Sequence, residues 1–373
     1  MKVLLTATVQ SHICQFHKPL AEVLHAHGCE VHVAARDNLA EKNGLKLDFV
    51  EKVFDVPFSR SPKSADNIRA YKELKRIIET EKYDVIHCNT PMGGIVTRLA
   101  AKKARKKGTK VFYTAHGFHF YKGASKKNWL FFYPIEKLFA KKTDKLITIN
   151  REDYSLASKK FKTDVSYIHG VGVNEERYYP VSDEKRLELR KKLGFKESQK
   201  IMLCVGELLP NKNQKMAIKV MEKLVKDFPD CVLLIAGNGP EKENLEALIK
   251  QIKVEDNVKL LGYCTCLEEY QRISDLSLSC SKREGLPLNV VEAMLTQRPF
   301  VATANRGHCE LIADGENGFI VAVDDVDAMY ERIKDLISDE QKNKSMGNNA
   351  RKIALQYSFG SVKGELEKIY FEI

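Results

Sequence analysis

Short runs rich in β-branched and other apolar residues alternate along the chain with longer stretches whose apolar residues recur at helical spacing. This alternation predicts repeated strand–helix units, in which parallel strands form a sheet and helices cover its faces. The first half has such runs at 3–8, 30–35, 84–88, 110–114, 145–149 and 165–168. The second half has them at 201–205, 231–236, 258–261, 276–279, 300–302 and 319–321. The sequence therefore predicts an α/β protein with two doubly wound, Rossmann-like sheets.

The length of 373 residues exceeds what one hydrophobic core usually organises. A segment with two glycines, followed by Pro180, lies between the halves and suits a hinge. We expect a first domain at 1–170, a second at 171–356 and a final helix at 357–373. Val362, Leu366 and Tyr370 lie on one stripe of that helix, which needs a surface to pack against. Two sheets facing each other would enclose a deep cleft.

Bulk composition narrows the class of protein. Hydrophobic residues make up 43% and charged residues 30% of the chain, which excludes a disordered or fibrous protein. No apolar run approaches the ~20 residues of a membrane-spanning helix, and Met1 to Leu5 reads as a strand, so a cytoplasmic location is expected. The nine cysteines include no Cys-x-x-Cys pair, and Cys264 with Cys266 lacks further partners, so we expect reduced thiols and no metal there.

Positive charge is concentrated between Lys102 and Lys145. This segment has thirteen Lys and Arg residues against Glu136 and Asp144, an excess of eleven that equals the formal net charge of the chain, +11. Two interpretations remain open: solvated helix faces, or a surface for anionic lipid headgroups, because aromatic residues such as Trp129 and Phe131 interleave the lysines. The sequence shows no nucleic-acid-binding motif, so nucleic acid is not an expected partner.

The run at 276–279 is followed by a loop ending in Glu284, Gly285, Leu286 and Pro287, and then by a predicted helix from Leu288 to about Thr296. Proline suits a first helical turn. The N–H groups and dipole of a helix start attract a diphosphate, and Gly285 allows close backbone approach. Glu292, about one turn into the helix, can accept two hydrogen bonds from vicinal hydroxyls such as those of a ribose.

The string Glu-Gly-Leu-Pro-Leu-x-x-x-Glu-Ala-Met resembles the Glu-x7-Glu motif of the retaining glycosyltransferases with the GT-B fold, which build bacterial polysaccharides and glycolipids. The resemblance spans essentially the whole chain and is strongest between Gly206 and Glu292. It implies a GT-B fold with the last helix returning to the first domain. It also implies that Glu292 holds the donor ribose and that Glu284 contacts the transferred sugar. Gly285, Leu286, Pro287 and Asn289 are further expected donor-binding residues.

The loop after the run at 201–205 resembles the Gly-Arg-Leu-x-x-x-Lys-Gly loop of that family. Gly206 falls on its first glycine and Lys212 on its lysine, which implies that Lys212 binds the donor diphosphate. Glu207 stands where arginine is usual, so the charge there is reversed. Arg283 or Lys282 are the candidates to replace that arginine.

Two further segments agree with the resemblance. Gly237 and Gly239 match the Gly-x-Gly-Pro turn of the family, where the sheet meets the nucleotide. Tyr263 follows the run at 258–261, where the family reads the base through backbone groups. The side chains there do not reveal which base is bound.

The first sheet contributes two segments at strand ends, both expected to be loops. His116, followed by Gly117, resembles the family's histidine beside the donor sugar and the reaction centre. Ser11 and His12 stand where many members have a Gly-Gly pair. The pattern Ser-His-x-x-x-Phe-His, which ends in Phe16 and His17, resembles that of capsular and exopolysaccharide transferases. It implies that His12 or His17 orients the acceptor or the phosphate, and the choice between them is open.

The resemblance implies a retaining enzyme that transfers a hexose or N-acetylhexosamine from a UDP-sugar to a lipid-linked saccharide, bound peripherally at the inner face of the plasma membrane. His116, Glu284 and Lys212 are the expected catalytic residues. No metal and no other cofactor is expected, because Lys212 and the helix start can stabilise the departing diphosphate. A sugar-nucleotide epimerase or a phosphorylase on the same fold is the alternative. A dinucleotide-dependent oxidoreductase would need Gly-x-Gly-x-x-Gly after the first strand, and no glycine occurs there.

Overall fold

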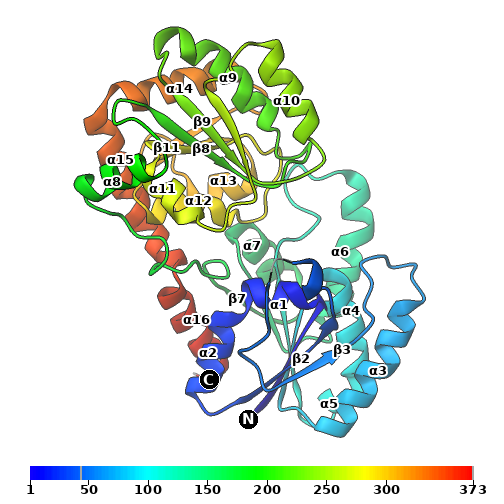
Figure 1. The fold of residues 1–373 in the computed structure, drawn as a ribbon. Helices are drawn as coiled ribbons and strands as arrows, with labels where there is room; N and C mark the ends of the chain where they lie inside the picture. The colour runs from blue at the N-terminus through cyan, green and yellow to red at the C-terminus, as the bar shows by residue number, and fades with distance from the viewer. Residues whose placement is uncertain (43, 372–373) are drawn as a thin grey trace. The chain divides into compact units, whose positions relative to one another are not determined.

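The computed structural model describes residues 1–42 and 44–371. The chain forms two compact units, the first made of Met1–Gly172 with Phe359–Ile373 and the second of Val173–Ser358. Each unit is built around one parallel sheet with helices on both faces (Figure 1). The predicted α/β class with two Rossmann-like sheets is therefore confirmed.

The first unit has a seven-stranded sheet in the order β3-β2-β1-β4-β5-β6-β7. All neighbouring strands are parallel. Its elements are β1 (Lys2–Val9), α1 (Gln10–Phe16), α2 (Lys18–Ala26), β2 (Glu30–Arg36), the 3-10 helix η1 (Leu39–Glu41), β3 (Lys52–Asp55), α3 (Asp66–Glu81), β4 (Val85–Asn89), α4 (Pro91–Ala100), α5 (Lys102–Arg105), β5 (Lys110–Ala115), α6 (Lys126–Ala140), β6 (Lys145–Thr148), α7 (Arg151–Lys160), β7 (Asp164–Tyr167) and α16 (Phe359–Phe371).

Two details of the first unit differ from the sequence prediction. Strand β3 was missed because it is an edge strand whose residues are largely solvent-exposed, so it lacks the apolar run of a central strand. The segment after β1 was predicted to be a loop but forms helix α1, which at seven residues is too short for a clear helical period.

The last helix, α16, belongs to the first unit, where it packs against α2. Val362, Leu366 and Tyr370 are buried there, as the apolar stripe predicted. The hydroxyl of Tyr370 lies 2.6 Å from His87 Nδ1 on β4, which fixes the helix over the centre of the sheet.

The second unit has a six-stranded parallel sheet in the order β10-β9-β8-β11-β12-β13. Its elements are α8 (Asp183–Lys192), β8 (Ile201–Val205), α9 (Gln214–Asp227), β9 (Val232–Ala236), α10 (Lys242–Gln251), β10 (Val258–Gly262), α11 (Leu267–Ile273), β11 (Leu276–Ser279), α12 (Leu288–Leu295), β12 (Phe300–Thr303), α13 (Arg306–Leu311), β13 (Gly318–Val321), α14 (Val326–Ser338), α15 (Glu340–Ala354) and the 3-10 helix η2 (Leu355–Tyr357).

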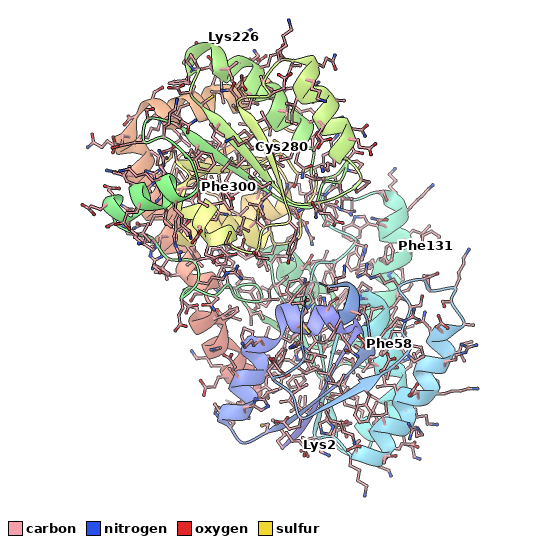
Figure 2. The ribbon with its side chains drawn as sticks, viewed as in Figure 1. Lys2, Phe58, Phe131, Lys226, Cys280 and Phe300 are labelled. Atoms are coloured by element: carbon pink, nitrogen blue, oxygen red, sulfur yellow. The ribbon has the colours of Figure 1, made fainter. Side chains whose placement is uncertain are left out.

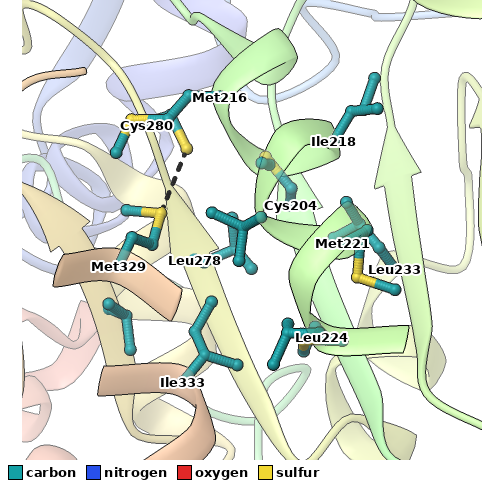
Figure 3. Packing of buried hydrophobic residues seen from close by; sticks show 14 of the residues in the cluster. Cys204, Met216, Ile218, Met221, Leu224, Leu233, Leu278, Cys280, Met329 and Ile333 are labelled. Atoms are coloured by element: carbon teal, nitrogen blue, oxygen red, sulfur yellow. Dashed lines mark hydrogen bonds between the residues drawn. The ribbon is translucent and has the colours of Figure 1, made fainter. Parts of the chain in front are cut away.

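The core of the second unit follows the alternation of its strands. Met202 and Cys204 on β8 face a cluster that includes α9 and α14, whereas Ile201 and Leu203 face a second cluster beneath α8 and α11. Figure 3 shows part of the first cluster, in which Cys280 Sγ lies 3.5 Å from Met329 Sδ. Burial on both faces explains why these strands read as continuous apolar runs.

Within residues 1–42 and 44–371, every helix is too short or too polar to cross a lipid bilayer. The nine cysteines are all free thiols, and most of them are buried.

Candidate functional site

Both sheets reverse their strand order at one point. In the second unit this point lies between β8 and β11, and in the first unit it lies between β1 and β4. Ligands of open parallel sheets bind beyond the carboxyl ends of strands at such a point, because the connections leave in opposite directions and open a crevice. Lys212 and Glu284 follow β8 and β11, and the predicted histidines follow β1 and β5, next to β4.

Glycines hold the loops after β8 and β9 in backbone contact. A Cβ on Gly237 would lie 2.0 Å from the carbonyl oxygen of Gly206, and one on Gly239 would lie 2.4 Å from that of Leu208. The Gly206 N–H donates to Ala236 at 2.9 Å, and the Leu208 N–H donates to Asn238 at the same distance. These glycines are therefore required for the close packing of the two loops, and their contact with a donor stays a prediction.

Lys212 and Glu284, predicted to bind the departing diphosphate and the transferred sugar, form an ion pair. Lys212 Nζ lies 2.7 Å from Glu284 Oε1, and both side chains are largely buried. The stem of Lys212 runs over Gly206, where an added Cβ would lie 3.4 Å from Lys212 Cδ. Asn211 connects the same two loops, because its carbonyl accepts from Lys282 N–H at 2.8 Å and its side-chain amide donates to the Arg283 carbonyl at 3.0 Å. The loops after β8 and β11 therefore present an ammonium and a carboxylate together.

Helix α12 begins directly after this loop. Pro287 is its N-cap and no side chain caps its first turn, so the helix start is open to an anion. The predicted end at about Thr296 is one residue past the observed end at Leu295. Asn289, predicted as a donor ligand, donates its side-chain amide to the Val205 carbonyl at 3.0 Å and ties the helix to β8.

Glu292 lies on α12 in a half-buried position, hydrogen-bonded to Tyr178 and near Arg177. Burial raises the pKa of this carboxyl to about 7, although Tyr178 and Arg177 act in the opposite direction. Arg177 is itself paired with Glu268 at 2.8 Å. A carboxylate that changes charge near neutral pH and faces a phenol is suited to exchange hydrogen bonds with ligand hydroxyls.

Tyr178 and Arg177 were not found from the sequence. They lie in the segment after the interdomain glycines, which was interpreted only as a hinge. The one available signal was the dipeptide of tyrosines before Pro180. Only the fold brings this segment to α12.

His308 was also missed. It is buried, its Nδ1 lies 2.7 Å from the Thr303 carbonyl, and its Nε2 has no hydrogen-bond partner. Burial lowers the pKa of His308, while the charge of Glu284 raises it. A Cβ on the preceding residue, Gly307, would lie 2.8 Å from Glu284 Cβ. Helix α13 therefore backs the loop that carries Glu284 with a neutral imidazole.

The remaining predicted donor residues lie on the surface or beside the loop. Tyr263 is 60% exposed after β10. Arg283 is exposed, and within the described part of the chain its guanidinium makes no hydrogen bond or ion pair. Lys282 lies 3.4 Å from Asp324, and Glu207 is exposed. Gly285 and Leu286 are half-buried between α12 and α13.

In the first unit, Ser11 is a structural residue of α1. Its N–H donates to Asn38 Oδ1 at 3.0 Å, and its hydroxyl accepts from Asn38 Nδ2 at 2.9 Å. Phe16 packs edge-on against His12, with ring centroids 4.9 Å apart. His116 follows β5 in an irregular segment, as predicted.

The fold brings three of the predicted histidines together. His12 Nε2 lies 3.2 Å from His116 Nε2, and one ring nitrogen from each of His12, His17 and His116 lies within 4.8 Å of the others. His116 Nε2 is also 3.2 Å from Asn89 Oδ1 at the end of β4. Burial lowers the pKa of His12 to about 4 and holds the pKa values of His17 and His116 well below their usual range. These imidazoles are therefore neutral at pH 7.

One Asp-x-Asp pair of the kind that binds divalent cations occurs in the chain, at Asp325 and Asp327. Asp325 caps α14 by accepting from Ala328 N–H at 2.9 Å, and Asp327 pairs with Lys223. Both carboxylates therefore already have structural partners.

Two Rossmann-like units, each with polar residues at its switch point, are the architecture of the GT-B fold. The sequence profile described as "Glycosyl transferases group 1" matches residues 185–353, and that described as "Glycosyl transferase 4-like" matches residues 2–150. EpsD of Bacillus subtilis, which is named as a glycosyltransferase, is 42% identical to this chain over 99% of this chain and 96% of its own length. The chain belongs to this glycosyltransferase family.

Other relatives are more distant. An Escherichia coli UDP-Gal:alpha-D-GlcNAc-diphosphoundecaprenol alpha-1,3-galactosyltransferase is 25% identical over 90% of this chain and 88% of its own. Among solved structures, HepE of Anabaena in complex with UDP has a TM-score of 0.80 at 21% identity, with both chains fully covered. WaaG, a glycosyltransferase of lipopolysaccharide biosynthesis, has a TM-score of 0.76 at 18% identity over 99% of each chain. These structures show that the fold is GT-B.

Proposed function

We propose that this glycosyltransferase transfers a hexose or N-acetylhexosamine from a UDP-sugar to a lipid-linked saccharide with retention of anomeric configuration. The observation that carries the proposal is the Lys212–Glu284 pair at the β8/β11 switch point, with Glu292 on the helix that follows. The E. coli relative is named for a UDP-galactose donor and an undecaprenol-linked acceptor, and HepE was solved with UDP, which supports the choice of donor and acceptor class.

The proposed chemistry follows from charge. Breaking the anomeric C–O bond leaves negative charge on the nucleotide diphosphate and positive character on the sugar ring. Lys212 and the open start of α12 stabilise the departing diphosphate, so the transfer itself needs no metal. Donor binding draws Lys212 toward the phosphates and leaves Glu284 to accept hydrogen bonds from the sugar. The acceptor hydroxyl attacks from the face that the diphosphate leaves, and the leaving phosphate takes its proton.

Arg283 supplies the positive charge that is missing at position 207, where this chain has glutamate. Arginine is usual at position 207 in the family, and glutamate there places an exposed negative charge beside the phosphate loop. Arg283 directly precedes Glu284, and its guanidinium has no partner among the described residues, so it can bind a phosphate without breaking an existing ion pair.

The proposed acceptor side is the first unit. His116 lies beside the reacting sugar, and His12 or His17 orients the acceptor. The lipid part of the acceptor remains in the membrane, and helix α6 provides the contact with the anionic lipid surface. Leu130, Phe131 and Leu138 are 71%, 63% and 54% exposed on this helix. Figure 2 shows Phe131 pointing away from the rest of its unit.

The charges around α6 suit that contact. The only acid within α6, Glu136, is buried and pairs with Arg98 at 3.2 Å, so it adds no negative charge to the surface. Asp144 is held by Arg105 at 2.8 Å. Lysines at both ends of the helix are left to meet lipid phosphates, while the exposed side chains enter the interface.

A vesicle experiment tests the membrane contact. The protein should sediment with vesicles containing anionic lipid at low salt and be released as salt screens the lysines. A Leu130→Ser/Phe131→Ser double variant should bind markedly less, whereas Ile68→Ser, which removes a 62% exposed apolar side chain from α3, should bind as the wild type does. Equal binding of the α6 variant would refute the role of this helix.

A thermal-shift screen of UDP-, GDP- and ADP-sugars tests the donor site. A ligand at ~100 times its dissociation constant stabilises the protein by roughly 2.7 kcal/mol, which is measurable. UDP-sugars should raise the Tm of the wild type and fail to raise that of Lys212→Ala. No shift with any nucleotide sugar would refute the donor site. Conversion of a UDP-sugar to its epimer without acceptor would favour the alternative reaction.

A further inference from the structure

The histidines at the carboxyl edge of the first sheet form a compact nitrogen cluster. His12 comes from α1 after β1, His17 from the junction of α1 and α2, and His116 from the segment after β5. One ring nitrogen from each lies within 4.8 Å of the other two. The order β1-β4-β5 in the sheet brings them together although more than a hundred residues separate His12 from His116.

The cluster has the spacing of a metal site. Tetrahedral zinc binds imidazole nitrogen at about 2.0 to 2.1 Å, which places two such ligands about 3.3 Å apart. The separation of His12 Nε2 and His116 Nε2 is 3.2 Å. The other nitrogen separations in the cluster reach up to 4.8 Å, so binding requires the His17 nitrogen to move inward by at most about 1.5 Å.

His17 supplies a second, independent observation. Its side chain is 4% exposed, and its Nε2 is buried without a hydrogen-bond partner. A buried polar atom without a partner costs free energy, so such atoms usually have a ligand, an ion or a water as their partner. His87, the fourth histidine nearby, differs in this respect, because Tyr370 and Thr114 occupy both of its nitrogens at 2.6 and 2.7 Å.

Metal binding requires an unprotonated ring nitrogen on each imidazole. In the metal-free protein, either His12 Nε2–H donates to His116 Nε2, or His116 Nε2–H donates to His12 Nε2 or to Asn89 Oδ1. Binding also requires that this proton move to Nδ1, a change of tautomer.

We propose that His12, His17 and His116 bind one zinc ion per chain through three imidazole nitrogens. Three neutral nitrogen ligands without a thiolate or carboxylate favour zinc or a later first-row metal over magnesium or calcium. One further ligand completes four-coordination, and Asn89 Oδ1, 3.2 Å from His116 Nε2, is a candidate for it. This site lies in the first unit, whereas the residues proposed to stabilise the diphosphate lie in the second.

The consequence for activity rests on the proposed function. If His116 contacts the donor sugar, a metal bound to its Nε2 withdraws it from that contact. Zinc is then an inhibitor of a transferase that needs no metal, and a chelator restores activity. The binding of zinc itself does not depend on this consequence, so the two claims fail separately.

Metal binding is tested directly with the full chain. Titration with Co²⁺ should give the visible absorption of a four-coordinate ion at one equivalent, and Zn²⁺ should displace it. Calorimetry with Zn²⁺ should give the same stoichiometry. Loss of a metal-orienting neighbour typically costs 10- to 100-fold in affinity, so loss of a ligand in His12→Gln should cost at least about 100-fold.

Two further variants separate the site from folding and from adventitious binding. His17→Gln should also lose the Co²⁺ spectrum, with near-ultraviolet circular dichroism as the check that the unit is folded. His25→Gln, which removes an exposed histidine from α2, should keep the full spectrum. Absence of binding by the folded wild type, unchanged binding in His12→Gln, or a thiolate-to-cobalt band from the free cysteines would each overturn the proposal.

Discussion

Glu292 should make donor affinity depend on pH. Its pKa of about 7 means that roughly one tenth of the carboxyl is ionised at pH 6 and about nine tenths at pH 8. If the donor ribose binds only the carboxylate, affinity for UDP-glucose should rise about tenfold across that interval, or about 1.4 kcal/mol. UDP-glucose is a suitable probe because its diphosphate is esterified at both ends and does not titrate there.

The variant Glu292→Gln should abolish this dependence. A carboxylate accepting charge-assisted hydrogen bonds contributes about 1.5 to 3 kcal/mol per bond, so two bonds reduced to weaker neutral ones should lower affinity at pH 8 by about 100-fold. The histidines of the first unit do not interfere with the measurement, because burial lowers the pKa of His12 to about 4 and holds that of His116 well below its usual range. Each should keep one protonation state between pH 6 and 8.

The assay is isothermal calorimetry at constant ionic strength from pH 6 to pH 8. Glu222→Gln, an exposed change on α9, is the control and should behave as the wild type does. A wild-type affinity that is flat with pH, or a Glu292→Gln variant that retains the tenfold rise, would refute the reasoning. The free protein offers a second check, because a raised folded pKa stabilises below the unfolded value of about 4.5 and this contribution is lost as pH rises through about 7. Between pH 5 and 8 the Tm of the wild type should therefore fall relative to that of Glu292→Gln.

Three further perturbations test the packing and the phosphate site. Gly237→Ala should cost about 3 kcal/mol in urea unfolding, because its Cβ meets the Gly206 carbonyl at 2.0 Å, whereas Gly364→Ala in α16, with open space around it, should be neutral or stabilising. Glu136→Gln should lower the free energy of unfolding by about 3 kcal/mol, because it leaves the Arg98 charge buried and unpaired. Glu79→Gln, at an exposed ion pair, should lower it by under about 1 kcal/mol. Equal losses in the two variants would contradict this. Arg283→Ala should weaken UDP binding by about tenfold in calorimetry and Lys282→Ala much less, since Lys282 is engaged with Asp324. The reverse order would assign the compensating cation to Lys282.

The sheets could be predicted from the sequence because their strands are buried on both faces. Each central strand is a run of apolar residues, and the helices between them are long enough to show their period. Strand β3 could not be found this way, because it lies at the edge of the sheet and its end residues, Lys52 and Asp55, are exposed and charged. Helix α1 failed for a different reason: seven residues give less than two full turns of pattern.

The candidate donor residues Gly206, Lys212, Glu284 and Glu292 were visible in the sequence because they lie within short contiguous strings beside strand ends. The partners that set their chemistry were not. Tyr178 reaches Glu292 from the segment between the units, and His308 reaches the Glu284 loop from the next helix. The histidine cluster required the β1-β4-β5 order, which no local pattern encodes. Contacts between distant segments depend on topology, so single-sequence reasoning misses them.

The most direct measurement is a transfer reaction with a UDP-sugar and N-acetylglucosamine linked through a diphosphate to a lipid, followed by nuclear magnetic resonance of the product. We expect a new glycosidic bond with the anomeric configuration of the donor, formed in the presence of a chelator and lost in Lys212→Ala. A product of inverted configuration, or transfer that persists unchanged without Lys212, would contradict it.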